Sequence, residues 1–221
     1  MRRLLRENGL SLVLGALFLV MLLGHALAGH RENNEDRREH GRVTIGFAAY
    51  LQTGHFLESV FENWESEFFQ MGFYIVLTVF LRQKGSAESK SLEGKEEVDE
   101  DPRQKRADPR APVPVRRGGW VLKLYEHSLG LAFVLLFLAS FALHALSGLK
   151  LYNEERLAHG QAAASLGEYV GGSRFWFESF QNWQSEFLAV LAIVGLSIFL
   201  REKGSPESKP VASPHSETGS G

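Results

Sequence analysis

The chain contains no cysteine among its 221 residues. Disulfide bonds, thiolate metal ligands and cysteine nucleophiles are therefore excluded, while the cellular compartment stays undecided. Phosphate-binding glycine loops and nucleophile elbows are also missing, and no basic patch occurs outside the central segment. Because these motifs carry much of phosphate, acyl-transfer and nucleic-acid chemistry, we expect neither an enzyme nor a nucleic-acid-binding protein.

Proline is scarce and confined to two places. All seven prolines lie within residues 102–114 and 206–214. The first group coincides with the mixed charge run Glu93–Arg117, which has too little apolar surface to repay the cost of ordering. We therefore predict a disordered cytoplasmic linker at residues 91–119 and a disordered cytoplasmic tail at residues 210–221.

Two stretches contain no Lys, Arg, Asp or Glu: Leu10–Gly29 over twenty residues and Ser128–Leu149 over twenty-two. At about 1.5 Å per helical residue, each is long enough to cross a hydrocarbon core of about 30 Å. The average composition, with a formal net charge of −2, does not reveal these two apolar stretches, because charged residues elsewhere in the chain offset them. Two membrane-spanning helices are therefore predicted here.

Two shorter stretches, Phe68–Leu81 and Phe187–Leu200, lack charge over fourteen residues each. Length alone would fit a buried soluble helix or an interfacial segment. Each stretch follows an aromatic segment that contains Trp64 or Trp183, and its last leucine begins the basic sequence Leu-Arg-x-Lys-Gly. Since aromatic side chains favour the headgroup region and basic ones the cytoplasmic face, we predict two further spans. The expected fold is an all-α membrane protein with four transmembrane helices.

The chain matches itself without a gap at an offset of 119 residues. Phe61–Phe68 and Phe180–Phe187 share Phe-x-Asn-Trp-x-Ser-Glu-Phe, and Lys84–Lys90 and Lys203–Lys209 share Lys-Gly-Ser-x-Glu-Ser-Lys. Because an internal repeat carries one structural unit per copy, the duplication predicts two helical hairpins. We place the first hairpin at residues 1–90 and the second at residues 120–209.

The first apolar stretch also resembles a cleavable signal peptide. It follows Arg2, Arg3 and Arg6 and ends in Ala26-Leu-Ala28, a small-x-small pattern. However, the matching stretch of the second copy lies in the middle of the chain, where no signal peptide occurs, and aligns with the first down to His25 on His144. We therefore interpret the first stretch as a retained helix.

Basic residues are distributed unevenly about the four predicted spans. Seventeen Lys and Arg lie in the N-terminal, central and C-terminal segments, and seven lie in the inter-span loops, residues 30–55 and 150–174. Since basic residues near span ends are retained in the cytoplasm, both termini and the centre are predicted to be cytoplasmic. Both hairpins then share one orientation, as parallel repeats do.

Ionisable residues are costly inside a membrane, so the few that are expected at membrane depth are the first candidates for function. Counting about 1.5 Å per residue from the inner ends of the spans places His25 and Glu67 at similar depth, and the repeat adds His144 and Glu186. These four form a candidate intramembrane site. They fit hydrogen-bonded structural pairs, a substrate, proton or ion site, a metal site, or haem between the histidines. None lies in a local metal-ligand motif, so no metal ligand is assigned and no cofactor is expected.

Aromatic residues recur at helical spacing before each second span. Phe56–Trp64 and Phe175–Trp183 each predict an amphipathic helix that lies in the outer interface before the chain turns inward. Trp64, Trp176 and Trp183 are the expected interfacial anchors. The remaining loop histidines, His30, His40, His55 and His159, fit solvated or capping roles better than metal ligation.

With its two repeated motifs, the chain resembles a bacterial integral-membrane family known as a domain of unknown function. The resemblance extends to Asp101-Pro-Arg in the linker and to Arg174–Phe180 before the last span. It implies a multi-pass protein of the bacterial plasma membrane and transfers no activity. We expect a non-catalytic envelope protein that contacts the lipid bilayer and binds lipid, a membrane protein partner or a second copy. A small transporter or channel using the His/Glu level, and a metal- or haem-binding membrane protein, are the alternatives.

Overall fold

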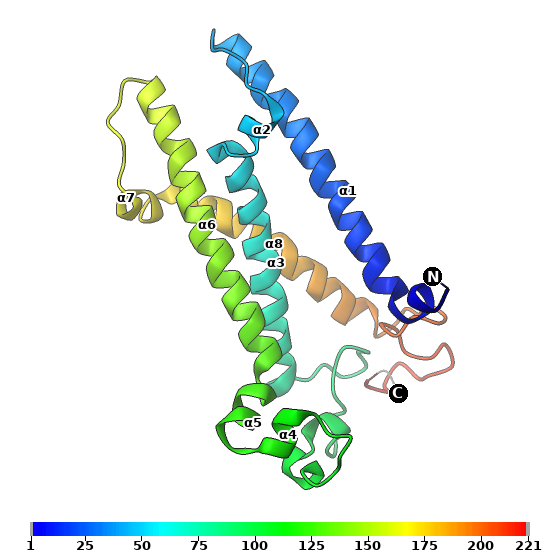
Figure 1. Cartoon of the computed structure of the whole chain (residues 1–221). Coiled ribbons are helices and arrows are strands. Elements are labelled where there is room, and N and C mark those ends of the chain that lie inside the picture. The colour runs from blue at the N-terminus through cyan, green and yellow to red at the C-terminus, as the bar shows by residue number, and fades with distance from the viewer. Residues whose placement is uncertain (1, 220–221) are drawn as a thin grey trace. The chain divides into compact units, whose positions relative to one another are not determined.

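The structure, a computed structural model, describes residues 2–219 and in that part of the chain contains helices and no strands (Figure 1). The prediction of an all-α fold is confirmed for these residues. The elements are, in chain order, α1 (Arg2–Glu39), α2 (Phe47–Tyr50), α3 (Gly54–Phe80), η1 (Glu97–Asp99), η2 (Pro102–Lys105), α4 (Val113–Arg117), α5 (Gly119–Glu126), α6 (Ser128–Ala158), α7 (Leu166–Val170) and α8 (Ser173–Leu196).

The chain divides into two compact units. The first unit consists of Met1–Phe61 and Leu143–Phe175, and the second of Glu62–Ala142 and Trp176–Gly221. Each unit therefore combines segments that lie far apart in the sequence and come from both predicted hairpins. The boundaries of hairpins, linker and tail divide the chain in a different way and stay predictions.

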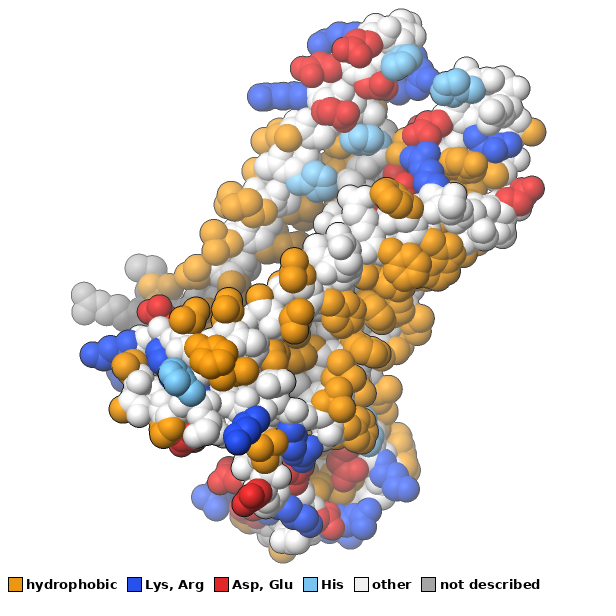
Figure 2. All heavy atoms as spheres, turned by 180° about the vertical axis from the view of Figure 1, so that it is seen from behind, with side chains coloured by type: hydrophobic (Ala, Val, Ile, Leu, Met, Phe, Trp, Pro, Cys, Tyr) orange, Lys and Arg blue, Asp and Glu red, His pale blue; other side chains and the backbone are white. Residues whose placement is uncertain are grey.

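Helix α1 exposes the apolar side chains along its length. Leu10, Leu19 and Met21 are 76%, 63% and 66% exposed, and 6% of the most apolar window of α1 is buried. In the described part of the chain, two helices are long and apolar enough to cross a membrane, Arg3–Glu39 and Ser128–Ala158. Figure 2 shows the hydrophobic side chains of α1 giving way to charged and histidine side chains at one end.

A break in the backbone precedes both apolar stretches at equivalent positions. Within α1, Asn8 leaves the helical region with φ −131° and ψ 16°. His127, 119 residues later, separates α5 from α6 with φ −115° and ψ 9°. Asn and His are both weaker helix formers than Leu or Ala, which suits them to such a break. The two copies thus begin with the same short helix before the long one.

The turn predicted between an interfacial helix and the second span is absent, and this expectation is wrong. Helix α3 runs over Gly54–Phe80 as one helix of 27 residues, and α8 runs over Ser173–Leu196 as one helix of 24 residues. Neither helix contains proline, so each residue can donate its N–H to the carbonyl four residues earlier. The Trp-containing motifs are therefore the polar halves of longer helices.

The second unit contains the same turn after α3 and after α8. Gln83 N donates to Ser89 Oγ at 2.9 Å, and Glu202 N donates to Ser208 Oγ at 3.0 Å. Gly85 has φ 85°, and its equivalent 119 residues later has φ 89°, a conformation that glycine adopts without steric cost. The Lys-Gly-Ser-x-Glu-Ser-Lys motif is therefore a folded turn in both copies.

The C-terminal segment packs on the first of these turns. Gly85 N donates to Thr218 Oγ1 at 2.9 Å, and Gly219 N donates to Ser86 O at 2.9 Å. Lys209 is 1% exposed. Its Nζ donates to the carbonyls of Pro214, His215 and Glu217 at 3.2, 3.2 and 2.8 Å. Residues 210–219 are therefore tied to the second unit by specific hydrogen bonds, although a disordered tail is predicted there.

Candidate functional site

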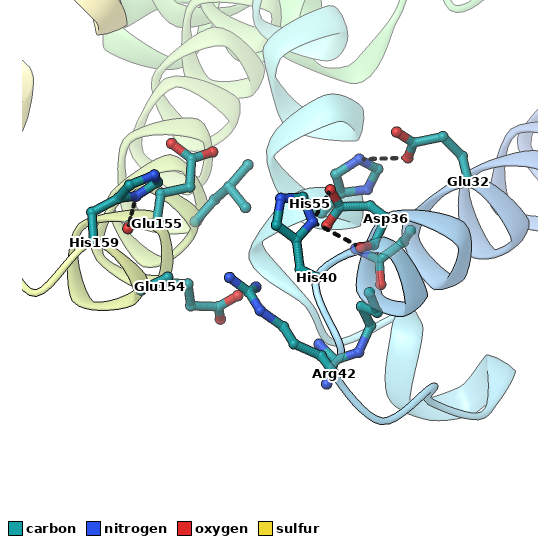
Figure 3. A pocket seen from close by; sticks show the side chains of 12 residues that line it. Glu32, Asp36, His40, Arg42, His55, Glu154, Glu155 and His159 are labelled. Carbon is teal, nitrogen blue, oxygen red and sulfur yellow. Dashed lines mark hydrogen bonds and ion pairs between the residues drawn. The ribbon is translucent and has the colours of Figure 1, made fainter.

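The loop ends of the first unit enclose a cavity of about 390 Å³, termed the loop pocket (Figure 3). Its wall comes from the end of α1 with the loop that follows, from the start of α3, and from the end of α6. Titratable and basic side chains dominate this wall: Glu32, Asp36, Arg37, His40, Arg42, His55, Glu154, Glu155 and His159. The pocket thus gathers side chains from both copies of the repeat.

The two loops beside the loop pocket are held by the same pair of hydrogen bonds. Asn34 Oδ1 accepts from Ile45 N at 2.8 Å, and Asn34 Nδ2 donates to Ile45 O at 2.9 Å. Asn153 makes the same two bonds with Ala164, at 2.7 and 3.0 Å. Because an amide side chain offers both a donor and an acceptor, each asparagine fixes its loop to the helix before it.

His40 and His159 close the C-terminal ends of α1 and α6. His40 Nδ1 lies 2.9 Å from the carbonyl oxygen of Asp36, and His159 Nδ1 lies 2.8 Å from that of Glu155. A carbonyl oxygen only accepts, so Nδ1 carries the proton of each neutral ring and Nε2 keeps its lone pair. The glycine after each histidine has φ 66° and 70°, which suits a helix end. The predicted capping role of these two histidines is confirmed.

His55 differs because both of its ring nitrogens have partners. Nε2 lies 3.1 Å from Glu32 Oε2, and Nδ1 lies 3.1 Å from the Tyr50 hydroxyl. Burial, together with the negative charge of Glu32, raises the pKa of Tyr50 to about 12, so the phenol stays protonated and donates to Nδ1. The proton of neutral His55 is therefore on Nε2, where it faces Glu32.

Two carboxylates of the loop pocket are engaged by neighbouring side chains. Asp36 Oδ1 lies 3.1 Å from His40 Nδ1, which also contacts the Asp36 carbonyl. Arg174 donates to both carboxylate oxygens of Glu155. Bidentate pairing of this kind fixes a carboxylate in place more firmly than a single bond does. The position of Glu155 is thus set by the start of α8.

Two other oxygen-bearing side chains of the wall have no such partner. The Glu154 carboxylate makes no hydrogen bond or ion pair with any residue in the range 2–219, although Figure 3 shows the Arg42 side chain extending toward it. Asn33 Oδ1 is buried and has no hydrogen-bond partner among the described residues. Since buried polar atoms are usually paired, the wall has acceptor capacity to spare.

The four residues predicted to share one membrane depth belong to different units. His25 and His144 lie in the first unit, whereas Glu67 and Glu186 lie in the second. Glu67 is exposed and Glu186 is half-buried, and their negative charges are close enough to interact. Whether the histidines and glutamates meet at one site therefore stays a prediction.

Within the first unit, each of these histidines has a different environment. His25 is exposed, and its Nε2 lies 3.1 Å from Ser59 Oγ. His144 is 0% exposed and stacks on Phe175 with 4.8 Å between ring centroids. A His144 ring nitrogen and a Glu58 carboxylate oxygen lie within 4.8 Å of each other. Glu58, 6% exposed, is the carboxylate beside His144 in this unit, and the sequence did not point to it.

The predicted anchors Trp64, Trp176 and Trp183 all lie in the second unit. Trp183 Nε1 donates to Glu65 Oε1 at 3.0 Å, and its ring centroid lies 4.6 Å from that of Phe69. Trp183 of the second motif thus packs against the first motif. Trp176 is 37% exposed, and the lipid contact of the three tryptophans stays a prediction.

A model of one protein family, described as a domain of unknown function (DUF6766), matches residues 1–220. The chain belongs to the DUF6766 family. The predicted membership in a family of unknown function is thereby confirmed, while the family description names neither the repeated motifs, nor a membrane location, nor an activity. No curated protein and no solved structure matches this DUF6766 chain.

The sequence of this DUF6766 chain carries a signal for part of the loop pocket. His40 and His159 each lie four residues after an acidic residue, Asp36 and Glu155, in both copies. Residues four apart share one face of a helix, so the pattern predicts two equivalent His/acid faces. The contribution of His55 has no such signal, because it comes from another helix and its equivalent in the second copy is Arg174.

Proposed function

We propose that this chain is a non-catalytic, multi-pass protein of a bacterial plasma membrane, which binds lipid or a membrane partner. The observation that carries the proposal is the exposed apolar surface of α1. In a soluble protein, a helix that is apolar on all sides is buried. In α1, by contrast, only 6% of the most apolar 18-residue stretch is buried. Exposed apolar surface costs about 25 cal/mol per Å² in water, and a hydrocarbon core removes that cost.

Helices α3 and α8 support the proposal of four spans. With 27 and 24 residues at about 1.5 Å each, both exceed the roughly 30 Å of a hydrocarbon core. Their uncharged C-terminal parts would lie in the core, and the carboxylates of their N-terminal halves would reach the outer headgroups. The Lys-Gly-Ser turns would then lie on the cytoplasmic side.

Exposed aromatic side chains of the second unit support binding of lipid or of a partner. Trp176, Phe177 and Phe180 are 37%, 69% and 58% exposed, and they follow one another along α8. Aromatic residues are enriched where membrane proteins meet the headgroup region and where proteins meet one another. A second copy of this chain is one partner that such a surface would suit.

Reporter fusions and membrane extraction test this function. The protein is expected to stay in the membrane fraction after alkaline carbonate washing, and fusions after Lys90, Gly118 and Gly221 are expected to report the cytoplasm. Native mass spectrometry of the detergent-purified protein is expected to show retained lipid or a second subunit. Release by carbonate, or an external signal from any of the three fusions, would contradict the four-span topology.

A further inference from the structure

His40 and His159 are oriented as metal-binding histidines are. In metal sites, one ring nitrogen usually donates to a carbonyl or carboxylate, which fixes the tautomer and directs the other nitrogen to the ion. Nδ1 of His40 and His159 occupy this role, at 2.9 and 2.8 Å from main-chain carbonyls. Within the described residues, Nε2 of neither ring makes a hydrogen bond, and both residues line the loop pocket.

The carboxylates of the loop pocket complete a mixed nitrogen and oxygen donor set. Glu154 has no partner within residues 2–219, and Asp36 lies next to His40. Imidazole and carboxylate together suit Zn²⁺ and related divalent transition metals. Calcium and magnesium, by contrast, prefer sites made of oxygen atoms.

The charge of the wall also favours a cation. With neutral histidines, four carboxylates face two guanidinium groups in the loop pocket, and one of the four, Glu155, is paired with Arg174 from outside the wall. Arg37 uses its Nε to hold the loop after α1, donating to Val43 O at 2.7 Å. The unpartnered Asn33 Oδ1 adds a further acceptor that a cation would satisfy. The excess of carboxylates and the unpartnered acceptor both lower the free energy of a bound positive ion.

We infer that the loop pocket binds one divalent transition-metal ion of the zinc class through His40, His159, Asp36 and Glu154. The inference goes beyond the binding of lipid or of a partner and does not depend on the membrane topology. In the part of the chain that is described, no three of these donor atoms lie within 4.8 Å of one another. The paired hydrogen bonds of Asn34 and Asn153 hold the main chain of both loops. Closure around an ion therefore falls on rotation of the Asp36 and Glu154 side chains, while both histidines keep their Nδ1 bonds.

Isothermal titration of the detergent-purified full chain with ZnCl₂ tests the inference. At about pH 7.5, one ion per chain is expected to bind, and affinity is expected to fall at least tenfold near pH 5.5, because the ligands must lose their protons. His40→Asn and His159→Asn each keep an amide donor near the Nδ1 position and remove Nε2. Each substitution is expected to weaken binding about tenfold or more.

Three further variants make the test specific. Glu154→Gln removes a charge that has no partner to lose among the described residues, so it is expected to weaken binding without disturbing the fold. Arg42→Gln introduces the residue that the second copy carries at position 161, and is expected to tighten binding by removing a competing cation. His127→Asn introduces the residue found at the equivalent position 8 and serves as the control, with unchanged affinity expected.

Several results would overturn the inference. Absence of Zn²⁺ binding by the parent would do so, as would equal affinity in the parent and in a His40→Asn/His159→Asn double variant. Calcium binding that matches zinc and survives in the double variant would identify a site made of carboxylates alone. An equal loss in His127→Asn would show nonspecific binding to histidines. Circular dichroism of each variant shows whether a loss of binding comes from unfolding. None of these binding results tests the membrane topology.

Discussion

Gly29 of α1 lies against the ring of Tyr50, and the substitution Gly29→Ala measures how tightly the first unit is packed there. A Cβ atom at position 29 would lie 2.2 Å from the Tyr50 hydroxyl oxygen and 3.2 Å from Cζ. Tyr50 is 0% exposed, and its hydroxyl is hydrogen-bonded to His55. The ring therefore has to move, and its hydrogen bond is lost when it does.

Three effects set the size of the change. Overpacking a filled site costs about 1–3 kcal/mol, and a lost hydrogen bond costs about 0.5–1.5 kcal/mol. Replacing a helical glycine by alanine returns about 0.5–1 kcal/mol. We therefore expect Gly29→Ala to lower the free energy of unfolding by about 2 kcal/mol. Gly24 in the same helix has nothing within 4 Å of its Cβ position, so Gly24→Ala is expected to be neutral or stabilising.

The measurement is chemical and thermal unfolding in detergent, followed by far-UV circular dichroism. Adding Tyr50→Phe to Gly29→Ala removes the atom at 2.2 Å and leaves the nearest contact at 3.2 Å, so most of the lost stability is expected to return. If Gly29→Ala is as stable as Gly24→Ala, or if Tyr50→Phe restores nothing, the reasoning from close contact is refuted.

The second copy sharpens the comparison. A Cβ atom at Gly148 would lie 2.2 Å from the Tyr169 hydroxyl oxygen and 2.9 Å from both Tyr169 Cζ and Glu58 Oε1. Removing the hydroxyl therefore leaves two contacts that are still too short. Tyr169→Phe is expected to rescue Gly148→Ala less completely than Tyr50→Phe rescues Gly29→Ala.

Two other predictions concern the turns and tail of the second unit. Burial and the charge of Glu207 raise the pKa of Glu88, so the folded protein holds an extra proton between about pH 4.5 and that raised value, and stability falls as pH rises through this window. Glu88→Gln is expected to flatten this dependence in pH-resolved unfolding, whereas Glu93→Gln leaves it unchanged. Lys209→Met strands three main-chain carbonyls and is expected to cost about 1–3 kcal/mol, seen as faster amide exchange in residues 210–219. The exposed control Lys203→Met is expected to leave exchange unaltered, and equal exchange in both variants would contradict a structural role for Lys209.

The apolar helices were predictable because their signal is local. The stretches Leu10–Gly29 and Ser128–Leu149 lie within α1 and α6, the two helices long and apolar enough to span a membrane. The ends of these helices were less predictable. Helix α1 continues through charged residues to Glu39, because the segment after Gly29 contains no proline or glycine that would end it. Such residues favour helix even where they end a hydrophobic stretch.

The site was less predictable because its geometry depends on packing between distant segments. Tyr50 and Tyr169 are equivalent in sequence, yet Tyr50 contacts His55 of its own copy whereas Tyr169 donates to Glu58 of the other copy at 3.4 Å. Glu58 aligns with Phe177, so comparing the two copies gave no reason to consider it. A repeat predicts what the copies share and does not predict where they differ.

The hydrogen bonds between the first Lys-Gly-Ser turn and residues 210–219 have a consequence for biosynthesis. Gly85 and Thr218 are separated by 133 positions, so their contact cannot form while the ribosome is still translating the second hairpin. We expect this turn to stay uncovered during synthesis and to be accessible to chaperones or proteases. The second unit is then completed only after Thr218 and Gly219 emerge, which makes the packing of these residues on the turn a late step in its folding.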